Sequence, residues 1–120
     1  MNKLGKFEKT ARGFDNVEFK DANGADCSVQ ASSAIGDYED SFDKPGSSYL
    51  WLGVNDADPK IMASDAKTLG IETKATHGWI NYEIPSEVSL NTRMHLNREQ
   101  VSGLVEELQY WLDNHKLLAE

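Results

Sequence analysis

The sequence has 120 residues, enough for one domain with a single apolar core. Twenty acidic against twelve basic side chains give a net charge of −8, which disfavours direct binding to the phosphate backbone of nucleic acids. Cys27 is the only cysteine, so an internal disulfide and a thiolate-rich zinc site are excluded.

The first twelve residues are rich in lysine and glycine. They carry four cations against one anion, a net charge of +3, with only Leu4 and Phe7 as apolar anchors. This composition predicts a flexible N-terminal arm over residues 1–12, followed by one domain over residues 13–120. The arm lacks the apolar stretch of a secretory signal, and no run in the chain is long enough to span a bilayer. We therefore expect a cytosolic protein without membrane contact.

A β-hairpin is predicted after the arm. Residues 14–20 alternate apolar and polar side chains, which is typical of a half-buried strand. Residues 21–24, Asp-Ala-Asn-Gly, supply the turn because Asn and Gly tolerate positive φ. The return strand over residues 25–30 places Cys27 and Val29 on its inner face.

A long polar loop separates the hairpin from the middle of the chain. This loop covers residues 36–48, and its acidic residues lie close together between residues 37 and 43. Residues 49–54, Tyr-Leu-Trp-Leu-Gly-Val, then have the composition of a central strand. A short helix is expected over residues 65–69, with Ser64 as its cap and Gly70 as its stop.

Two further strands are predicted before the C-terminal helix, over residues 79–84 and 88–96. Pro85 closes the first of them. The second strand has an inner and an outer set of side chains, with Val88, Leu90, Met94 and Leu96 inward and Asn91, Arg93 and His95 outward.

The C-terminal helix is the clearest element of the pattern. Asn97 as N-cap and Gln100 three residues later indicate a capping box, and the helix should run to about His115. Apolar residues recur at three- and four-residue spacing, namely Val101, Leu104, Val105, Leu108, Trp111 and Leu112. We therefore predict an α+β fold: a mostly antiparallel sheet of four or five strands, one long C-terminal helix packed on a face, and one short helix.

An acidic loop is the first candidate binding element. Carboxylates and aromatic side chains alternate here, in Asp37, Tyr38, Glu39, Asp40, Phe42 and Asp43. The carboxylates could occupy a basic groove where a partner expects phosphates, with the two aromatic rings as anchors. The alternative is a solvated loop whose aromatic rings pack back on the sheet.

A cationic cluster is the second candidate. Arg93 and Arg98 flank the junction between the last strand and the helix, and with the helix N-terminus they suit an anion or nucleotide, with Trp79 as an aromatic wall. The alternative is that Arg93 bonds a carboxylate or the carbonyl groups of a neighbouring strand.

Metal and catalytic sites find little support in the sequence. The stretch 55–58, Asn-Asp-Ala-Asp, lacks the glycine and the distant glutamate of a calcium loop and is explained by a turn. The histidines, His77, His95 and His115, lie far apart in the predicted elements, without a nucleophile or carboxylate pair at a catalytic spacing. We expect a non-enzymatic binding protein without a cofactor.

Residues 93–101, Arg-Met-His-Leu-Asn-Arg-Glu-Gln-Val, together with the helix that follows, resemble a C-terminal signature of small accessory proteins of tailed phages and prophages. The similarity extends over about residues 14–117, and the acidic segment 36–48 is an insertion relative to compact members. Further matching stretches are residues 17–19, 27–30, 32–33, 51–53, 59–64 and 78–79.

The resemblance implies a phage protein that acts in the cytoplasm of a host bacterium. Small phage proteins of this kind often antagonise host defence. The first hypothesis is an inhibitor that blocks a host protein or ribonucleoprotein effector, such as a CRISPR complex, through the acidic loop. The alternatives are a sponge for a nucleotide signal and a virion structural or assembly protein. A homodimer through sheet edges or the region of Tyr110 and Trp111 is also compatible with the pattern.

Overall fold

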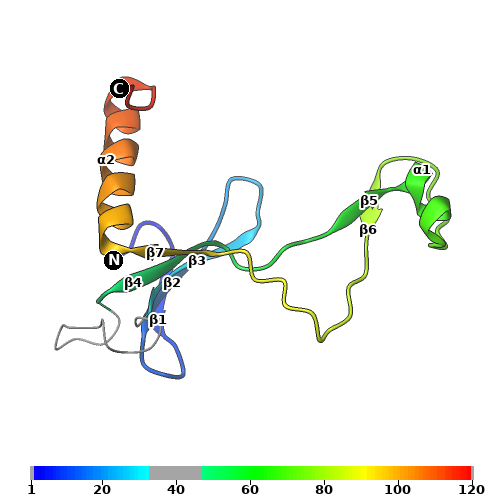
Figure 1. Cartoon of the computed structure of the whole chain (residues 1–120), viewed down its shortest axis with the longest axis horizontal. Helices are drawn as coiled ribbons and strands as arrows, with labels where there is room; N and C mark the ends of the chain where they lie inside the picture. The colour runs from blue at the N-terminus through cyan, green and yellow to red at the C-terminus, as the bar shows by residue number, and fades with distance from the viewer. Residues whose placement is uncertain (1, 33–46, 120) are drawn as a thin grey trace. The chain divides into compact units, whose positions relative to one another are not determined.

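The computed structural model describes residues 2–32 and 47–119. The chain divides into two compact units, Met1–Asn55 with Arg93–Glu120, and Asp56–Thr92. The first unit holds a five-stranded antiparallel sheet and the long helix, and the second a two-stranded sheet and a short helix (Figure 1). The predicted α+β fold class is confirmed.

The sheet of the first unit has the strand order β1-β2-β3-β4-β7, and every neighbouring pair is antiparallel. Because side chains alternate along a strand, the register gives this sheet one polar and one largely apolar face. The strands are β1 (Lys6–Lys9), β2 (Asp15–Lys20), β3 (Asp26–Ser32), β4 (Tyr49–Val54) and β7 (Met94–Asn97).

The hairpin between β2 and β3 forms as predicted. The Asp21 carboxylate accepts hydrogen bonds from the backbone N–H groups of Asn23 and Ala25, at 2.8 and 2.9 Å. Gly24 follows with a φ of 90°, a conformation that residues with a Cβ rarely adopt. The turn chemistry of four consecutive residues is therefore sufficient to fix this hairpin.

The N-terminal segment contributes a strand that the sequence interpretation missed. β1 pairs with β2 along its whole length, and the Lys9 ammonium lies 2.5 Å from the Asp15 carboxylate across the pair. A Cβ on Gly5 would lie 2.0 Å from the carbonyl oxygen of Glu18, so the chain enters β1 at a position that only glycine fits. All four residues of β1 are exposed, which explains why its sequence carries no core signal.

The long helix α2 (Arg98–Asn114) begins directly after β7. Asn97 Oδ1 accepts from the Gln100 N–H at 2.8 Å, and Gln100 Oε1 accepts from the Asn97 N–H at 3.0 Å. The predicted capping box is thus present. The helix ends at His115, whose φ of 61° stops further helical hydrogen bonding.

The coverage of the sheet by α2 differs from the expectation. The helix contacts β4 and β7, and Val101 in its first turn lies against Leu50 and Leu96. No residue of α2 is buried, and Leu108 and Trp111 are each 52% exposed. The helix starts where the last strand ends, without a loop that would let it turn back over the sheet. The predicted packing of the helix on the sheet is therefore limited to the start of the helix.

The second unit is small. β5 (Lys60–Met62) pairs antiparallel with β6 (Trp79–Asn81), and the short helix α1 (Ala63–Ala66) continues into the 3-10 turn η1 (Lys67–Leu69), which ends at Gly70 as predicted. Its buried residues among those described are two alanines of α1, Ala63 and Ala66.

Two predicted strands are shorter in the structure. The strand expected over residues 79–84 ends with β6 at Asn81, and the one expected over 88–96 is limited to β7, apart from an isolated bridge between Asp56 and Asn91. Apolar alternation forms a strand only where a neighbour accepts its hydrogen bonds, and the lost segments are largely exposed.

Acidification should weaken the β2–β3 turn. Hydrogen bonds from the N–H groups of Ala25 and Asn23 hold the pKa of Asp21 below its usual value of 3.8. The stabilisation is therefore present above pH 3.8 and lost as the pH falls through the lowered pKa. Asp21→Asn keeps an oxygen acceptor but cannot titrate, so its melting temperature, followed by circular dichroism, should fall less steeply in this range than that of the wild type.

The matched control is Asp21→Ala, which removes the acceptor and should lower the melting temperature at neutral pH as well. Identical acid profiles for the wild type and Asp21→Asn would show that the turn does not depend on this carboxylate.

Candidate functional site

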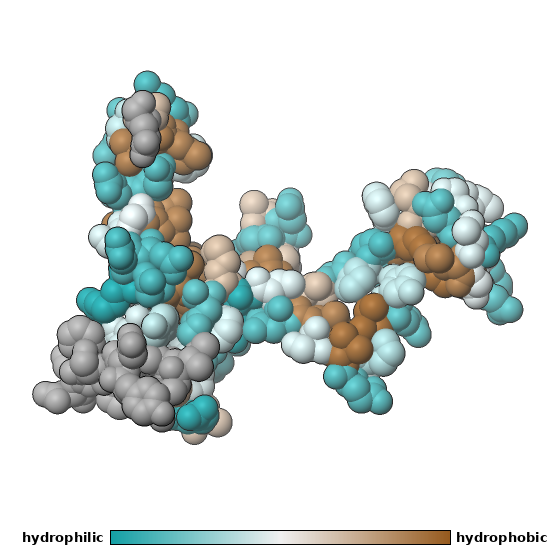
Figure 2. Space-filling model, viewed as in Figure 1, coloured by the Kyte–Doolittle hydropathy of each residue, from teal (hydrophilic) through white to brown (hydrophobic). Residues whose placement is uncertain are grey.

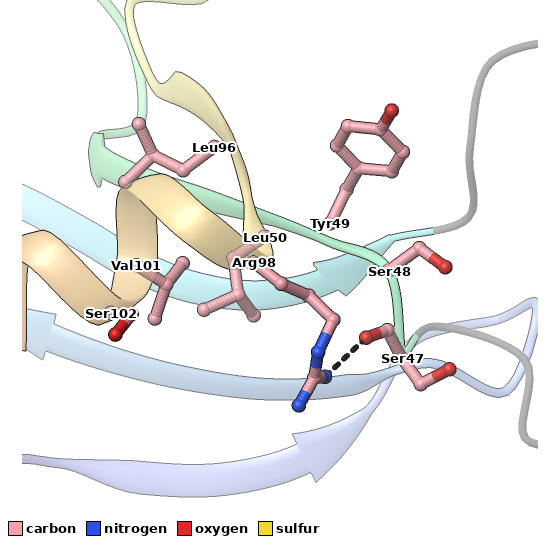
Figure 3. Close-up of a pocket in the computed structure, with 8 residues that line it drawn as sticks. All are labelled: Ser47, Ser48, Tyr49, Leu50, Leu96, Arg98, Val101 and Ser102. Carbon is pink, nitrogen blue, oxygen red and sulfur yellow. Dashed lines mark hydrogen bonds between the residues drawn. The ribbon is translucent and has the colours of Figure 1, made fainter. Parts of the chain in front are cut away.

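A pocket of about 320 Å³ lies where α2 begins beside β4 and β7 in the first unit (Figure 3). One wall is apolar and consists of Leu50, Leu96 and Val101. The other lining residues are Ser47, Ser48, Tyr49, Ser102 and Arg98. The pocket therefore combines an apolar wall with a single cationic side chain.

Arg98 supplies the positive charge of the pocket. It is the first residue of α2, and its Nη1 donates a 2.6 Å hydrogen bond to the carbonyl oxygen of Ser47. This bond joins the helix to the segment that leads into β4 (Figure 3). The capping box already uses the N–H of Gln100, so attraction of an anion to this helix end depends mainly on the Arg98 guanidinium.

Ser47 carries an unsatisfied polar atom at the same place. Its Oγ is buried and has no hydrogen-bond partner within the described part of the chain. A buried hydroxyl without a partner costs free energy, and such a group in a native protein calls for a specific explanation. Figure 3 shows the Ser47 side chain pointing away from Arg98, so the backbone carbonyl of Ser47 and not its hydroxyl faces the guanidinium.

Tyr49 is one of the residues that line the pocket, but its ring points to the other face of β4. Figure 3 shows the ring on the opposite side of β4 from Arg98. There it stacks on the His95 imidazole, with ring centres 5.0 Å apart. Tyr49 thus borders the pocket while its ring takes part in a second cluster on the polar face of the sheet.

This second cluster is a row of stacked groups. The centre of the His95 ring lies 4.1 Å from that of the Trp51 ring. The Arg93 guanidinium lies over the same Trp51 ring, 5.5 Å from its centre. Arg93 also donates to Ser28 Oγ at 3.1 Å and to Gln30 Oε1 at 3.0 Å, both on β3. Arg93, directly before β7, therefore links this end of the strand to β3 across β4. The pocket itself is lined by Arg98.

The other predicted site residues lie elsewhere. Trp79 is on β6 in the second unit and is 68% exposed. The acidic loop Asp37–Asp43 falls outside the described residues. The histidines do not form a common site: His95 is stacked, His115 caps α2, and His77 lies beside Thr76.

The rejected calcium loop is also explained by local contacts. Asp56 forms the bridge with Asn91, and the Asp58 carboxylate lies 3.4 Å from the Lys60 ammonium. Over residues 2–32 and 47–119, no three His, Cys, Asp or Glu side chains are grouped so that they could hold a metal ion.

Two functional features were missed in the sequence. The orphaned hydroxyl of Ser47 has no sequence signal, because it depends on the path by which the chain enters β4. The stack on Trp51 joins residues 42 positions or more apart in the chain, so spacing alone does not reveal it. The presence of Trp and Tyr two residues apart on one strand was the available signal.

Comparison of the chain with family models, with curated proteins and with solved structures finds no match. Among the described residues, none of the helices combines the length and apolar character needed to cross a membrane. The geometry of the first unit is therefore the basis for any functional conclusion.

Substitution of Arg93 should destabilise the first unit. Arg93→Ala removes the guanidinium from Trp51 and leaves Ser28, which is 2% exposed, without one of its partners. We expect a loss of about 1–3 kcal/mol in the free energy of unfolding, measured by chemical denaturation.

Lys116→Ala is the control, because it removes one positive charge from an exposed position of the same unit. A loss for Arg93→Ala no larger than that of the control would refute the cross-strand role of Arg93.

Proposed function

We propose that this chain is a phage-encoded, non-enzymatic binding protein that antagonises host defence by sequestering a small nucleotide signal in the Arg98 pocket. The observation that carries the proposal is the combination, in one pocket, of the Arg98 guanidinium with an apolar wall of Leu50, Leu96 and Val101. The resemblance of residues 93–101 to a phage signature supports the biological setting.

The chemistry of the pocket suits a nucleotide. A guanidinium can donate two parallel hydrogen bonds to a phosphate. The apolar wall of Leu50, Leu96 and Val101 offers a surface against which a base can pack. A volume of about 320 Å³ lies at the lower end of the range for small-molecule sites, which favours a ligand with few nucleotides.

The net charge of the protein selects against long polyanions. A charge of −8 repels an extended phosphate backbone along its whole length, whereas a small ligand needs favourable potential only near Arg98. At physiological ionic strength distant charges are screened beyond about 8 Å, so one local cation can dominate the binding of a short anion. This balance favours a mononucleotide or cyclic dinucleotide over RNA or DNA.

Thermal shift against a panel of linear and cyclic nucleotides tests this proposal. At least one member should raise the melting temperature, because a ligand that binds the native state stabilises it by mass action. Arg98→Ala should abolish the shift.

Lys116→Ala serves as the charge-matched control for Arg98→Ala and should retain full ligand binding. The proposal is wrong if no nucleotide of the panel shifts the melting temperature, or if Arg98→Ala binds the ligand as tightly as the wild type.

A second candidate mode is inhibition of a host protein or ribonucleoprotein effector through the acidic loop. The observation in its favour is the concentration of four carboxylates within seven residues, Asp37, Glu39, Asp40 and Asp43, next to Tyr38 and Phe42. Such a segment resembles a phosphate backbone in charge and would compete for a basic groove.

Replacement of these four carboxylates by serine should abolish a salt-sensitive complex with the effector, measured by titration calorimetry at two ionic strengths. The melting temperature of the free protein should not fall. Equal affinity of the variant and the wild type would exclude the acidic loop as the contact.

A further inference from the structure

The apolar stripe of α2, formed by Val101, Leu104, Val105, Leu108, Trp111 and Leu112, leaves large side chains in solvent. Val105, Leu108, Trp111 and Leu112 are 60%, 52%, 52% and 64% exposed. Figure 2 shows hydrophobic surface along this helix. A helix with this periodicity normally gains its stability by packing the stripe against another element. Among the described residues, α2 contacts β4 and β7, and Val101 in its first turn lines a pocket with Leu50 and Leu96.

The sheet of the same unit has an equally incomplete apolar face. The register aligns one row of apolar residues across all five strands, which are Phe7, Val17, Val29, Leu52 and Met94. The ends of this row are open, since Phe7 and Met94 are each 52% exposed. The three central residues of the row, Val17, Val29 and Leu52, are half-buried, so the open parts of this face are its two edges.

The dimensions of the two surfaces match. Five strands at about 4.8 Å spacing give a row of roughly 19 Å, and a helix of 17 residues is about 25 Å long. One helix is thus long enough to cover the row from Phe7 to Met94.

The helix of the same chain is prevented from doing this. β7 ends at Asn97 and α2 begins at Arg98, so no residue lies between them, whereas strand–helix connections usually contain two to six. The capping box of Asn97 and Gln100 further fixes the direction in which the helix leaves the strand. In Figure 1 α2 extends away from the strands after its first turn.

We propose that α2 of each chain packs on the apolar sheet face of a second copy, so that two chains exchange helices in a symmetric dimer. Each chain offers one exposed helix stripe and one sheet face whose edges are exposed, and the reciprocal arrangement covers both. The proposal is independent of the ligand in the Arg98 pocket.

Charge and area favour a second copy as the partner. α2 has one cation against four anions, a net charge of −3, whereas the first twelve residues, which include β1, have +3. Seven large apolar side chains on the two surfaces are 37–64% exposed. Four lie on the helix, namely Val105, Leu108, Trp111 and Leu112, and three on the sheet, namely Phe7, Val54 and Met94. At roughly 100 Å² each they provide about 700 Å² per chain, close to the 800 Å² typical of one side of a stable interface.

Sedimentation equilibrium of the wild type and two variants tests the dimer. The wild type should sediment with twice the chain mass at micromolar concentration. Leu108→Glu and Trp111→Glu should each weaken dimerisation by about 30-fold or more, because they place a charge in the buried centre of the interface. Gln109→Glu, which adds the same charge beside the stripe, should remain dimeric.

Crosslinking identifies which surfaces meet. In a Cys27→Ala background, a Phe7→Cys chain and a Leu108→Cys chain with tags of different length are co-expressed and treated with a short bis-maleimide. The expected product is a heterodimer of the two tagged chains, visible on a denaturing gel. This result requires only that both variants still dimerise, which sedimentation verifies.

Each other outcome overturns the proposal. A monomeric wild type shows that the two surfaces do not meet in a second copy. A dimer that survives both glutamate substitutions does not use the stripe. A crosslink restricted to pairs of Leu108→Cys chains shows that the helices pair with each other and leave the sheet face uncovered.

Discussion

The direct connection of β7 to α2 is the constraint on which the first unit depends. Asn97 is the last residue of the strand and the N-cap of the helix, so the capping box fixes the angle between them. This angle opens the pocket between Val101 and Leu50, brings Arg98 to the carbonyl of Ser47, and sends the rest of the helix past the sheet. A few hydrogen bonds at one junction thereby determine both the candidate ligand site and the exposed stripe.

The two faces of the sheet are stabilised in different ways. The polar face is held together by side-chain contacts between strands, since Arg93 bonds two residues of β3 and lies over the ring of Trp51. On the apolar face, the buried hydrophobic residue among those described is the small Cys27, so the core of this sheet is small. Hydrophobic burial scales with the area removed from water, so such a core contributes little to the stability of an isolated chain.

Local chemistry explains which parts of the fold could be predicted from the sequence. The turn at Asp21–Gly24 and the capping box at Asn97 and Gln100 depend on residues within four positions of each other, and both were predicted correctly. β1 was missed because an edge strand needs no apolar residues, and the segment before β7 was overpredicted because alternation does not reveal whether a partner strand exists.

Long-range pairing explains what the sequence could not provide. The partners of Arg93 lie 63 and 65 positions away, and the burial of the Ser47 hydroxyl follows from the path of the chain into β4. Arg93 bonds the side chains of Ser28 and Gln30 on β3, which lies one strand beyond β4 in the sheet. The helix stripe was recognised from its period, whereas the surface it covers depends on a junction angle that periodicity does not encode.

The order of the strands also bears on how the chain can vary. β4 and β7 are antiparallel neighbours, so Asp56–Thr92 is a single excursion between two strands that would otherwise form a hairpin. The entropy of closing a loop grows only with the logarithm of its length, and doubling such an excursion costs about 0.6 kcal/mol. Segments of very different size can therefore replace this unit while the ladder between β4 and β7 is retained, which makes it a natural site for insertions and deletions.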